Sequence, residues 1–482
     1  MGKVNRLART MMRRWKIWTA ALLLLAAFPV TAWSAEMYER DLLAEIRYIL
    51  KEYHLSNISE DELMEAAIEG MLSTIGDPYT DYMNAEEWQQ YQDSFEQTYV
   101  GVGIRLGQDE FGVYAVDVFS GSPAYEAGIL RGDYIVEVNG QSALGKTTEE
   151  IVSMIAGAEN TKVELTVLRD GDRKTYTLSR RSLSIPNVEY SWLPNGYGYI
   201  KINTFSLGAD EQFSEYMMKM KTAGLNGLVI DVRGNPGGYL ETVAYIAGEF
   251  LENGVLIHTR DKNGRDNPVT ILNGYSVDAP VVILIDENSA SGSEILAGAL
   301  QDHRLAKVVG VRSFGKGSVQ SVFLLSNGGV LKTTTQEYLT PNGHRVNGNG
   351  IEPDIEVKGR AAQLLTAFRE VGMKPLTVTT NRREMVVNGV SFGEPLPFVE
   401  QDGRVFVHSR VLGALAGLRV EWDGELRSVV MTRGDERILF AVDSADVMNR
   451  NGMAMIELDS FSKLIPEFSW NYTDGKLTMS VR

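Results

Sequence analysis

The spacing of hydrophobic and polar positions divides the chain into segments. In residues 36–95 apolar side chains recur every three to four positions, which predicts amphipathic helices. Residues 96–182 instead hold short β-branched runs bounded by turn residues, a pattern typical of strands. From residue 197 to about 375 strand-like and helical runs alternate, and residues 376–482 return to short strands with one small helix. The alternation predicts a layered α/β core flanked by smaller parts.

The first 35 residues have the pattern of an export signal. Six basic residues precede the apolar run 17–30, and small residues at 32–35 offer a cleavage site. A retained membrane anchor is the alternative, although the run is shorter than the roughly 20 residues of a typical membrane span. Under either interpretation the rest of the chain works outside the cytoplasm.

Composition narrows the classes of function. The formal net charge of -16 argues against a nucleic-acid partner, because phosphate binding needs a basic surface. The chain has no cysteine, which excludes disulfides and thiol catalysis. Its five histidines are not paired at the spacing of metal ligands. We therefore expect neither a metal nor another cofactor.

Residues 283–302 place three serines between a strand-like run and a helical pattern. Ser289, Ser291 and Ser293 alternate with small residues just before the helix. Serines in this position commonly cap the helix by binding its free N–H groups. Alternatively, one of them is a nucleophile held where helix-terminal N–H groups face an oxyanion. This stretch alone leaves both interpretations open.

A nucleophilic serine needs a base, and the chain offers two candidates. His303 follows the serine-rich helix but has no obvious acidic residue to orient it. Lys316 lies between two glycines in an apolar neighbourhood, and Gln320 follows four residues later. On an extended strand both side chains would share a face, so that Gln320 could hold the amine. A lysine desolvated in such a site loses proton affinity and can serve as the base, although a surface lysine in a glycine-rich loop is the simpler interpretation.

Residues 120–141 resemble a PDZ domain, with a helical turn, an alternating strand and an Asn-Gly turn. PDZ domains bind an extended peptide and capture its terminal carboxylate on backbone N–H groups. The candidate loop residues are Val100, Gly101, Val102 and Gly103. A strand with a bulge is the alternative interpretation of this loop.

The PDZ resemblance also predicts the kind of peptide end that is bound. We expect an apolar last residue, in a groove lined by the strand 113–119 and the helix near residues 124–127.

Six motifs together resemble the C-terminal processing peptidases, or tail-specific proteases. They are the PDZ-like segment and IGDPYTDYM, VIDVRGNPGG, ENSASGSEI, SFGKGSVQ and LTPNGHRVNGNGIEPDIEV, which occur in the family's order over about residues 40–360. The resemblance implies that Ser291 is the nucleophile, Lys316 the base and Gln320 its support. Serine–lysine pairs are a known variant of the catalytic triad.

The same resemblance implies an oxyanion hole made of backbone N–H groups. Gly292 supplies one, although the family more often has alanine at this position. A glycine of the NPGG motif supplies the other, and we favour Gly237 over Gly238. Ser289 and Ser293 are then left as turn and cap residues.

Residues 386–431 resemble the small domain named for the N-terminus of copper amine oxidase. Copper is not implied, because His408 is the only histidine of this block and no ligand cluster surrounds it. A stabilising module, or one that binds the cell wall or a partner, is the simpler interpretation.

The sequence thus predicts an α/β multidomain protein with a serine peptidase core, an inserted PDZ domain and a small C-terminal α+β domain. The expected parts are a signal peptide or anchor, an N-terminal helical region, the PDZ domain, the peptidase core and the copper-amine-oxidase-like domain, at 1–35, 36–95, 96–182, 183–375 and 376–482.

The predicted activity is that of an exported serine endopeptidase, without a cofactor, that cleaves proteins near their free C-terminus. A catalytically silent peptide-binding scaffold and a cell-envelope interaction protein are the alternatives. Membrane or cell-wall association and a homodimer are further hypotheses about partners.

Overall fold

The computed structural model describes residues 36–95, 98–109, 112–119, 121–169, 171–184, 186–381, 384–394, 396–450 and 452–482. The predicted export signal at 1–35 lies outside these residues. The chain forms two compact units, divided after Pro78. No helix of the described residues is both long and apolar enough to cross a membrane.

The first unit contains the helices α2 (Glu36–Tyr53) and α3 (Glu60–Ile75). Helix α3 begins with a capping box, in which Ser59 and Glu62 exchange side-chain and backbone hydrogen bonds, and it ends at Gly76 in a left-handed conformation. An ion pair of 3.0 Å joins Lys51 to Glu60. The predicted helical region is therefore present, but residues 79–95 belong to the second unit.

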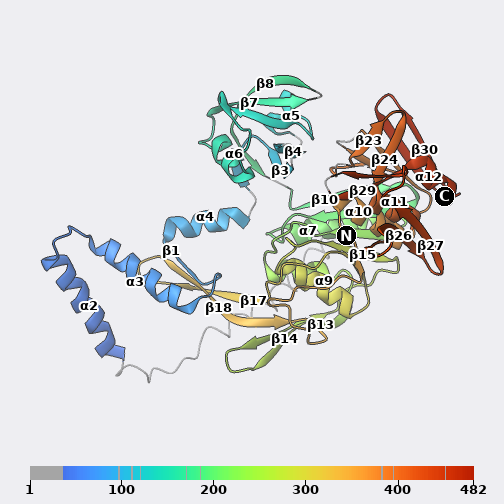
Figure 1. Ribbon diagram of the computed structural model, residues 1–482. Helices are drawn as coiled ribbons and strands as arrows, with labels where there is room; N and C mark the ends of the chain where they lie inside the picture. The colour runs from blue at the N-terminus through green and yellow to red at the C-terminus, as the bar shows by residue number, and fades with distance from the viewer. Residues whose placement is uncertain are drawn as a thin grey trace, which may run out of the picture. The chain divides into compact units, whose positions relative to one another are not determined.

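A six-stranded antiparallel sheet forms the PDZ-like part of the second unit. Its order is β3-β4-β5-β7-β8, with β6 beside β5. Figure 1 labels β3, β4, β7 and β8 of this sheet, together with α5 and α6. The elements are β3 (Ile104–Asp109), β4 (Gly112–Val118), α5 (Pro123–Ala127), β5 (Tyr134–Val138), β6 (Gln141–Ser142), α6 (Thr148–Ile155), β7 (Lys162–Arg169) and β8 (Asp172–Ser179). A separate pair, β2 (Thr98–Gly101) with β9 (Arg181–Ser184), flanks it.

The peptidase core is built on a six-stranded sheet of order β10-β11-β12-β15-β16-β19, parallel except for its edge strand β10. The strands are β10 (Val188–Leu193), β11 (Tyr197–Ile202), β12 (Gly227–Asp231), β15 (Val281–Ile285), β16 (Lys307–Gly310) and β19 (Ile355–Glu356), with a 3-10 turn at Pro194–Gly196. Strands β12 and β15 are buried along their whole length, as expected for a sheet covered on both faces.

Alternate residues of these strands pack into two different hydrophobic cores. Ile230 and Ile283 face α7 (Ala209–Ala223), α8 (Leu240–Ala247) and α9 (Gly292–Asp302). Val229 and Val282 face the opposite side, where they pack with α10 (Arg360–Glu370) and with residues 376–481. The C-terminal part therefore shares one core with the peptidase sheet, and it lies next to α10 in Figure 1.

A second antiparallel sheet adjoins the core in the order β1-β18-β13-β14, with β17 paired to β18. Its elements, and the helix that follows β1, are β1 (Asp81–Met83), α4 (Ala85–Phe95), β13 (Asn253–Asp261), β14 (Asp266–Leu272), β17 (Ser318–Leu324) and β18 (Val330–Leu339).

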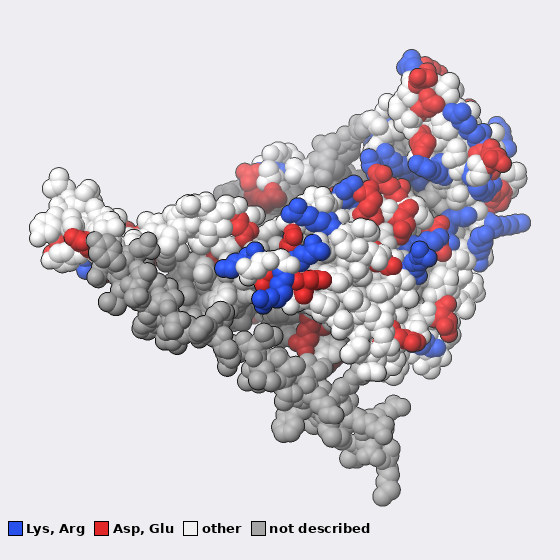
Figure 2. Space-filling model, turned by 90° about the horizontal axis from the view of Figure 1, so that it is seen from below, with Lys and Arg blue, Asp and Glu red and all other residues white. Residues whose placement is uncertain are grey.

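In its described residues the C-terminal part consists of three small sheets with two helices, so the predicted short strands are present but the single small helix that was expected is two. Its elements are β20 (Leu376–Thr380), β21 (Met385–Val387), β22 (Val390–Phe392), β23 (Phe398–Gln401), β24 (Arg404–His408), α11 (Ser409–Ala416), β25 (Arg419–Asp423), β26 (Ser428–Arg433), β27 (Glu436–Ala441), β28 (Val447–Arg450), β29 (Met453–Glu457), α12 (Leu458–Leu464), β30 (Phe468–Thr473) and β31 (Lys476–Val481). Acidic and basic side chains are interspersed on the face of the molecule in Figure 2.

Candidate active site

Ser291 lies on the turn between β15 and α9, directly before the first residue of the helix. Its backbone has φ 52° and ψ −110°, a conformation that residues other than glycine rarely adopt. Such a conformation costs on the order of 1–3 kcal/mol and persists only where the surroundings impose it. Helix α9, which follows it, is buried from Gly292 to Leu300, so the surroundings are closely packed.

Glu294 is the residue that holds this turn. One carboxylate oxygen accepts the N–H of Ser291 at 2.9 Å and the N–H of Lys316 at 2.8 Å. The other accepts the N–H of Gly315 at 2.7 Å and the hydroxyl of Ser313 at 2.5 Å. Burial raises the pKa of Glu294 above its ordinary value, although these four hydrogen bonds favour the ionised form. A single side chain thus fixes the backbones of both predicted dyad residues.

Tyr338 makes a second connection between the same two residues. Its hydroxyl donates to the carbonyl oxygen of Lys316 at 2.8 Å and lies 3.2 Å from the carbonyl oxygen of Ser291. Burial, and then the nearby charge of Glu294, raise the pKa of Tyr338 well above its ordinary value, so the hydroxyl stays a donor. The half-buried side chain of Lys316 places its Nζ 4.8 Å from the ring centre of Tyr79.

Gln320 and Lys316 do not lie on one extended strand, as the sequence suggested. Lys316 lies in the loop before β17, not on the strand, and the strand's register shifts between Val319 and Gln320. Simple alternation along an extended strand therefore does not relate the two side chains. The amide of Gln320 donates to Ser318 Oγ at 2.9 Å and to Thr334 Oγ1 at 3.2 Å. Its supporting role stays a prediction.

The predicted oxyanion residues Gly292 and Gly237 lie against each other. A Cβ atom on Gly237 would come within 2.8 Å of the Ser291 Cβ and 2.9 Å of the Gly292 nitrogen. Only glycine fits this approach, because that separation is shorter than real Cβ contacts. The N–H of Gly237 donates to Asn235 Oδ1 at 2.8 Å, so its role in binding an oxyanion stays a prediction.

The other two serines of the turn have structural hydrogen bonds. Ser289 Oγ donates to the Val232 carbonyl at 2.8 Å, and Ser293 Oγ donates to the Asn235 carbonyl at 2.9 Å. Both serines are fully buried. They join the turn at Ser291 to the loop that follows β12, as expected of turn residues.

His303 lies at the opposite end of α9 from Ser291. Eleven helical residues separate the two, which corresponds to about 16 Å. The His303 Nε2 is 2.8 Å from the Val255 carbonyl oxygen. This placement removes His303 as the alternative base.

The four predicted peptide-binding residues fall on two different elements. Val100 and Gly101 pair with β9 in the two-stranded sheet. Val102 and Gly103 form the loop before β3, and their carbonyls accept N–H groups from Ala124 and Phe119. The loop is therefore anchored to the start of α5.

The neighbours of strand β3 bear on where a peptide could be added. Strand β3 is the edge of its sheet in the described residues, and β4 is its inner neighbour. The helix that packs beside β3 is α6, whereas α5 packs against β8. The expected lining by 113–119 and by the helix near 124–127 stays a prediction, because the loop accepts N–H groups from Phe119 and Ala124 while β3 itself lies beside α6. An added peptide strand would lie between β3 and α6.

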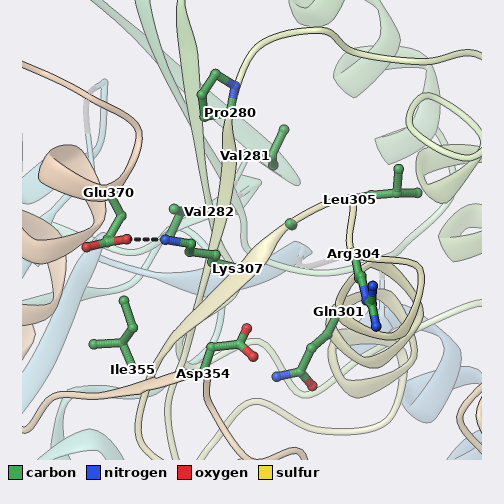
Figure 3. A pocket seen from close by; sticks show the side chains of 11 residues that line it. Pro280, Val281, Val282, Gln301, Arg304, Leu305, Lys307, Asp354, Ile355 and Glu370 are labelled. Carbon is green, nitrogen blue, oxygen red and sulfur yellow. Dashed lines mark hydrogen bonds and ion pairs between the residues drawn. The ribbon is translucent and has the colours of Figure 1, made fainter.

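A hollow on the peptidase core lies at the other end of the parallel sheet. Its lining includes Val281 and Lys307, which begin β15 and β16, whereas Ser291 follows the carboxyl end of β15 (Figure 3). An ion pair of 2.6 Å between Lys307 and Glu370 crosses it. Substrates in α/β sheets bind beyond the carboxyl ends of the strands, so this hollow is not the reaction site.

No three His, Asp or Glu side chains of the described residues gather as a metal-binding group. His408, the histidine of the copper-amine-oxidase-like block, caps helix α11 by accepting the N–H of Arg410 at 3.1 Å.

Comparisons with known proteins identify the family of the core. Residues 196–357 match the family described as Peptidase family S41. The carboxy-terminal processing protease CtpB of Bacillus subtilis (strain 168) is 34% identical over 341 residues, which make up 69% of this chain and 71% of that protein. The chain belongs to peptidase family S41. It is therefore a serine peptidase, and the predicted resemblance to the C-terminal processing peptidases is confirmed.

Three further matches cover the parts around the S41 core. Residues 115–169 match a PDZ domain, 376–466 the copper amine oxidase N-terminal domain, and 35–87 the domain described as Activating protease CtpB N-terminal domain. The first two confirm the predicted resemblances. The third gives a family to a segment whose periodicity indicated only helices.

Other similar proteins cover a similar part of the chain. A probable CtpA-like serine protease of Staphylococcus aureus (strain bovine RF122 / ET3-1) is 34% identical over 313 residues, which are 64% of this chain and 63% of that protein. A solved structure of the photosystem II D1 C-terminal processing protease is 26% identical and covers 66% of this chain and 93% of its own, with a TM-score of 0.44.

Two residues of the candidate site were missed from the sequence. Glu294 has a recognisable signal, because it stands three residues after Ser291, the spacing of a capping box. Tyr338 has no such signal in the sequence, because it reaches the site only through the pairing of β17 with β18.

Proposed function

We propose that this S41 peptidase cleaves polypeptides near their C-terminus through Ser291 and Lys316. The observation that carries the proposal is the joint anchoring of both residues by Glu294 and Tyr338, which keeps a strained serine next to the lysine loop. Preorganisation of this kind supplies much of the rate in acyl transfer.

In the proposed mechanism neutral Lys316 takes the proton of the Ser291 hydroxyl. The alkoxide attacks the scissile carbonyl, and the N–H groups of Gly292 and Gly237 stabilise the oxyanion. The protonated lysine then gives its proton to the leaving amine, and water hydrolyses the acyl-enzyme with lysine again as the base. Gln320 supports the lysine side chain.

We further propose that the PDZ domain selects substrates by their free carboxylate. The edge strand β3 and the adjoining loop of Val102 and Gly103 support this, because a peptide strand added to β3 would bring its terminus to that loop. A substrate held there is a polypeptide with an exposed, extended end.

We also propose that the peptidase acts outside the cytoplasm, on the basis of the basic and apolar pattern at 1–35. A homodimer is proposed through the first unit, whose helix α2 leaves Leu42, Leu43, Ile46 and Ile49 each about half exposed. Fractionation of cells and sedimentation of the purified chain test these two points.

The test of the dyad compares two variants. Ser291→Ala should abolish cleavage of a tailed peptide while peptide binding persists. Lys316→Arg should be equally inactive, because arginine stays protonated and cannot accept the serine proton. Substantial turnover by Lys316→Arg would reject lysine as the base, and turnover by Ser291→Ala would reject the site.

A further inference from the structure

Glu394 of the C-terminal part reaches into the peptidase core. It follows β22, and its side chain is 13% exposed. Its Oε1 lies 3.1 Å from a terminal guanidinium nitrogen of Arg233 and 3.0 Å from Nε of Arg360. One carboxylate of the C-terminal part thus pairs with two arginines of the core.

Arg233 is completely buried in the loop that follows β12. Its guanidinium binds Asp231 at 2.5–3.1 Å, and it also reaches Gln363 Oε1 at 3.1 Å. Burial would lower the pKa of Arg233, but the carboxylates of Asp231 and Glu394 outweigh it and raise the pKa. Burial opposes the ionised form of Asp231 as well, yet the charge of Arg233 holds its pKa well below the ordinary value. The positive charge of the buried Arg233 is therefore stabilised by both carboxylates, those of Asp231 and Glu394.

Arg360 carries the connection to the turn at Ser291. Its NH1 donates to Asp286 Oδ2 at 2.9 Å, at the carboxyl end of β15. The other oxygen of Asp286 accepts the N–H of Gly234 at 2.8 Å and the N–H of Asn288 at 3.1 Å. Asp286 therefore ties the loop after β12 to the loop after β15.

These two loops carry the two halves of the proposed site. The loop after β12 holds Asn235 and Gly237, and the loop after β15 holds Ser291. The carbonyl of Asn235 accepts the N–H of Ala290 at 3.0 Å. A shift of either loop would move the Gly237 backbone relative to the Ser291–Gly292 peptide, which it touches.

We propose that Glu394 is a positioning residue of the peptidase, which fixes the relative placement of the Gly237 loop and the Ser291 turn through Arg233 and Arg360. The C-terminal part is then a component of the active site's framework and not a detachable binding module. The inference rests on the proposed role of Ser291.

Loss of the Glu394 charge leaves Arg233 with one carboxylate partner in a buried site, and the loops must rearrange to compensate. Displacements of about 1 Å at a reaction centre can cost about 100-fold in rate. We therefore expect Glu394→Gln to lower kcat about 10- to 100-fold while KM for a short peptide changes less than about threefold.

The experiment uses the full chain with Glu394→Gln, Glu394→Asp, Arg360→Gln and the double variant Glu394→Gln/Arg360→Gln. Glu425→Gln is the matched control, because Glu425 is an exposed residue of the same C-terminal part. For each variant kcat, KM and the thermal midpoint are measured with one tailed peptide. Glu425→Gln should keep the kcat of the parent chain.

The double variant distinguishes a positioning role of Glu394 from a general effect on stability. If Glu394 acts through Arg360, the double variant should lose no more kcat than the worse single variant. Glu394→Asp, which keeps the charge on a shorter side chain, should recover part of the loss.

Three outcomes would overturn the inference. They are an unchanged kcat in folded Glu394→Gln, an unchanged kcat in Arg360→Gln where Glu394→Gln does not fold, and fully additive losses in the double variant. Failure of the proposed dyad can be told apart from failure of this inference, because it would show as turnover by Ser291→Ala.

Discussion

At the scale of single residues, two side chains hold the backbone of the candidate site. Glu294 and Tyr338 bind backbone groups of the two proposed dyad residues and hydroxyl or backbone groups beside them. Because the strained conformation of Ser291 needs such support, changes in these side chains should affect the rate more than the fold.

Tyr338→Phe isolates this effect, since it removes one hydroxyl and leaves the ring in place. We expect kcat to fall about tenfold with little change in KM, and the free energy of unfolding to fall by roughly 1 kcal/mol for the lost hydrogen bond. Steady-state kinetics and thermal melts measure the two effects. An unchanged kcat would show that the hydroxyl does not position the dyad.

At the scale of elements, helices and loops could be located from the sequence, but their neighbours could not. The turn from β15 into α9 follows from an apolar run that breaks into small residues, and the structure places it there. The pairing of Lys316 with Gln320 was inferred from simple alternation, which a register shift in β17 invalidates. Local periodicity does not record such shifts, nor the order of strands that placed α6 beside β3.

The edge strand β3, with α6 beside it, gives a prediction about peptide ends. Two peptides that differ only in a free or an amidated C-terminus should bind Ser291→Ala with affinities about 10- to 100-fold apart, because hydrogen bonds to a charged group contribute roughly 1.5–3 kcal/mol. Titration of both peptides measures the ratio. Equal affinities would mean that the PDZ domain does not recognise chain ends.

Helix α11 gives a prediction about pH. Burial, and then the charge of Arg410, lower the pKa of its cap His408 from 6.5 to about 4. Between pH 6.5 and pH 4 the His408 imidazole is therefore protonated in the unfolded chain but neutral in the folded chain. The stability that this residue contributes is complete above pH 6.5 and is lost as the pH falls through this window. The loss from this residue should reach about 2 kcal/mol at pH 5.

Denaturant melts at pH 7 and pH 5 measure this loss. The control is His408→Asn, which keeps a capping side chain but has no titrating group. This variant should lack the part of the pH-dependent loss of stability that comes from His408. The same pH dependence in His408→Asn would assign it to other residues.

At the scale of the whole molecule, the family, the PDZ domain and the α/β core could be predicted, because their motifs lie close together in sequence. The sequence did not predict that the C-terminal part and the peptidase sheet share one hydrophobic core. Residues 376–482 look independent in their pattern, yet Phe392 packs against Tyr199 of β11 and Phe368 of α10, with ring centres 5.0 and 5.4 Å apart. Contacts between segments so far apart leave no periodic signal in either.

This packing predicts that residues 376–482 are required for folding. Each large apolar side chain that their removal exposes costs roughly 1.5–3 kcal/mol, and a handful of them equals the net stability of a typical domain, about 5–15 kcal/mol. A chain ending at residue 375 should be insoluble or lack a cooperative melt. Removal of residues 1–78, which form the other unit, is the control and should leave the melt of the second unit intact. A soluble, active chain ending at 375 would contradict the shared core.

The position of β31 has a consequence for the order of events during synthesis. This strand lies between β20 and β30 in its sheet, and its residues Leu477, Met479 and Val481 are buried in the core that also covers the peptidase sheet. A ribosome makes Ser291 long before it makes β31, so the proposed nucleophile emerges on a sheet that still lacks its second cover. Hydrolytic activity should therefore appear only after translation has passed β31, so that the growing polypeptide does not act as a protease while it is still being made.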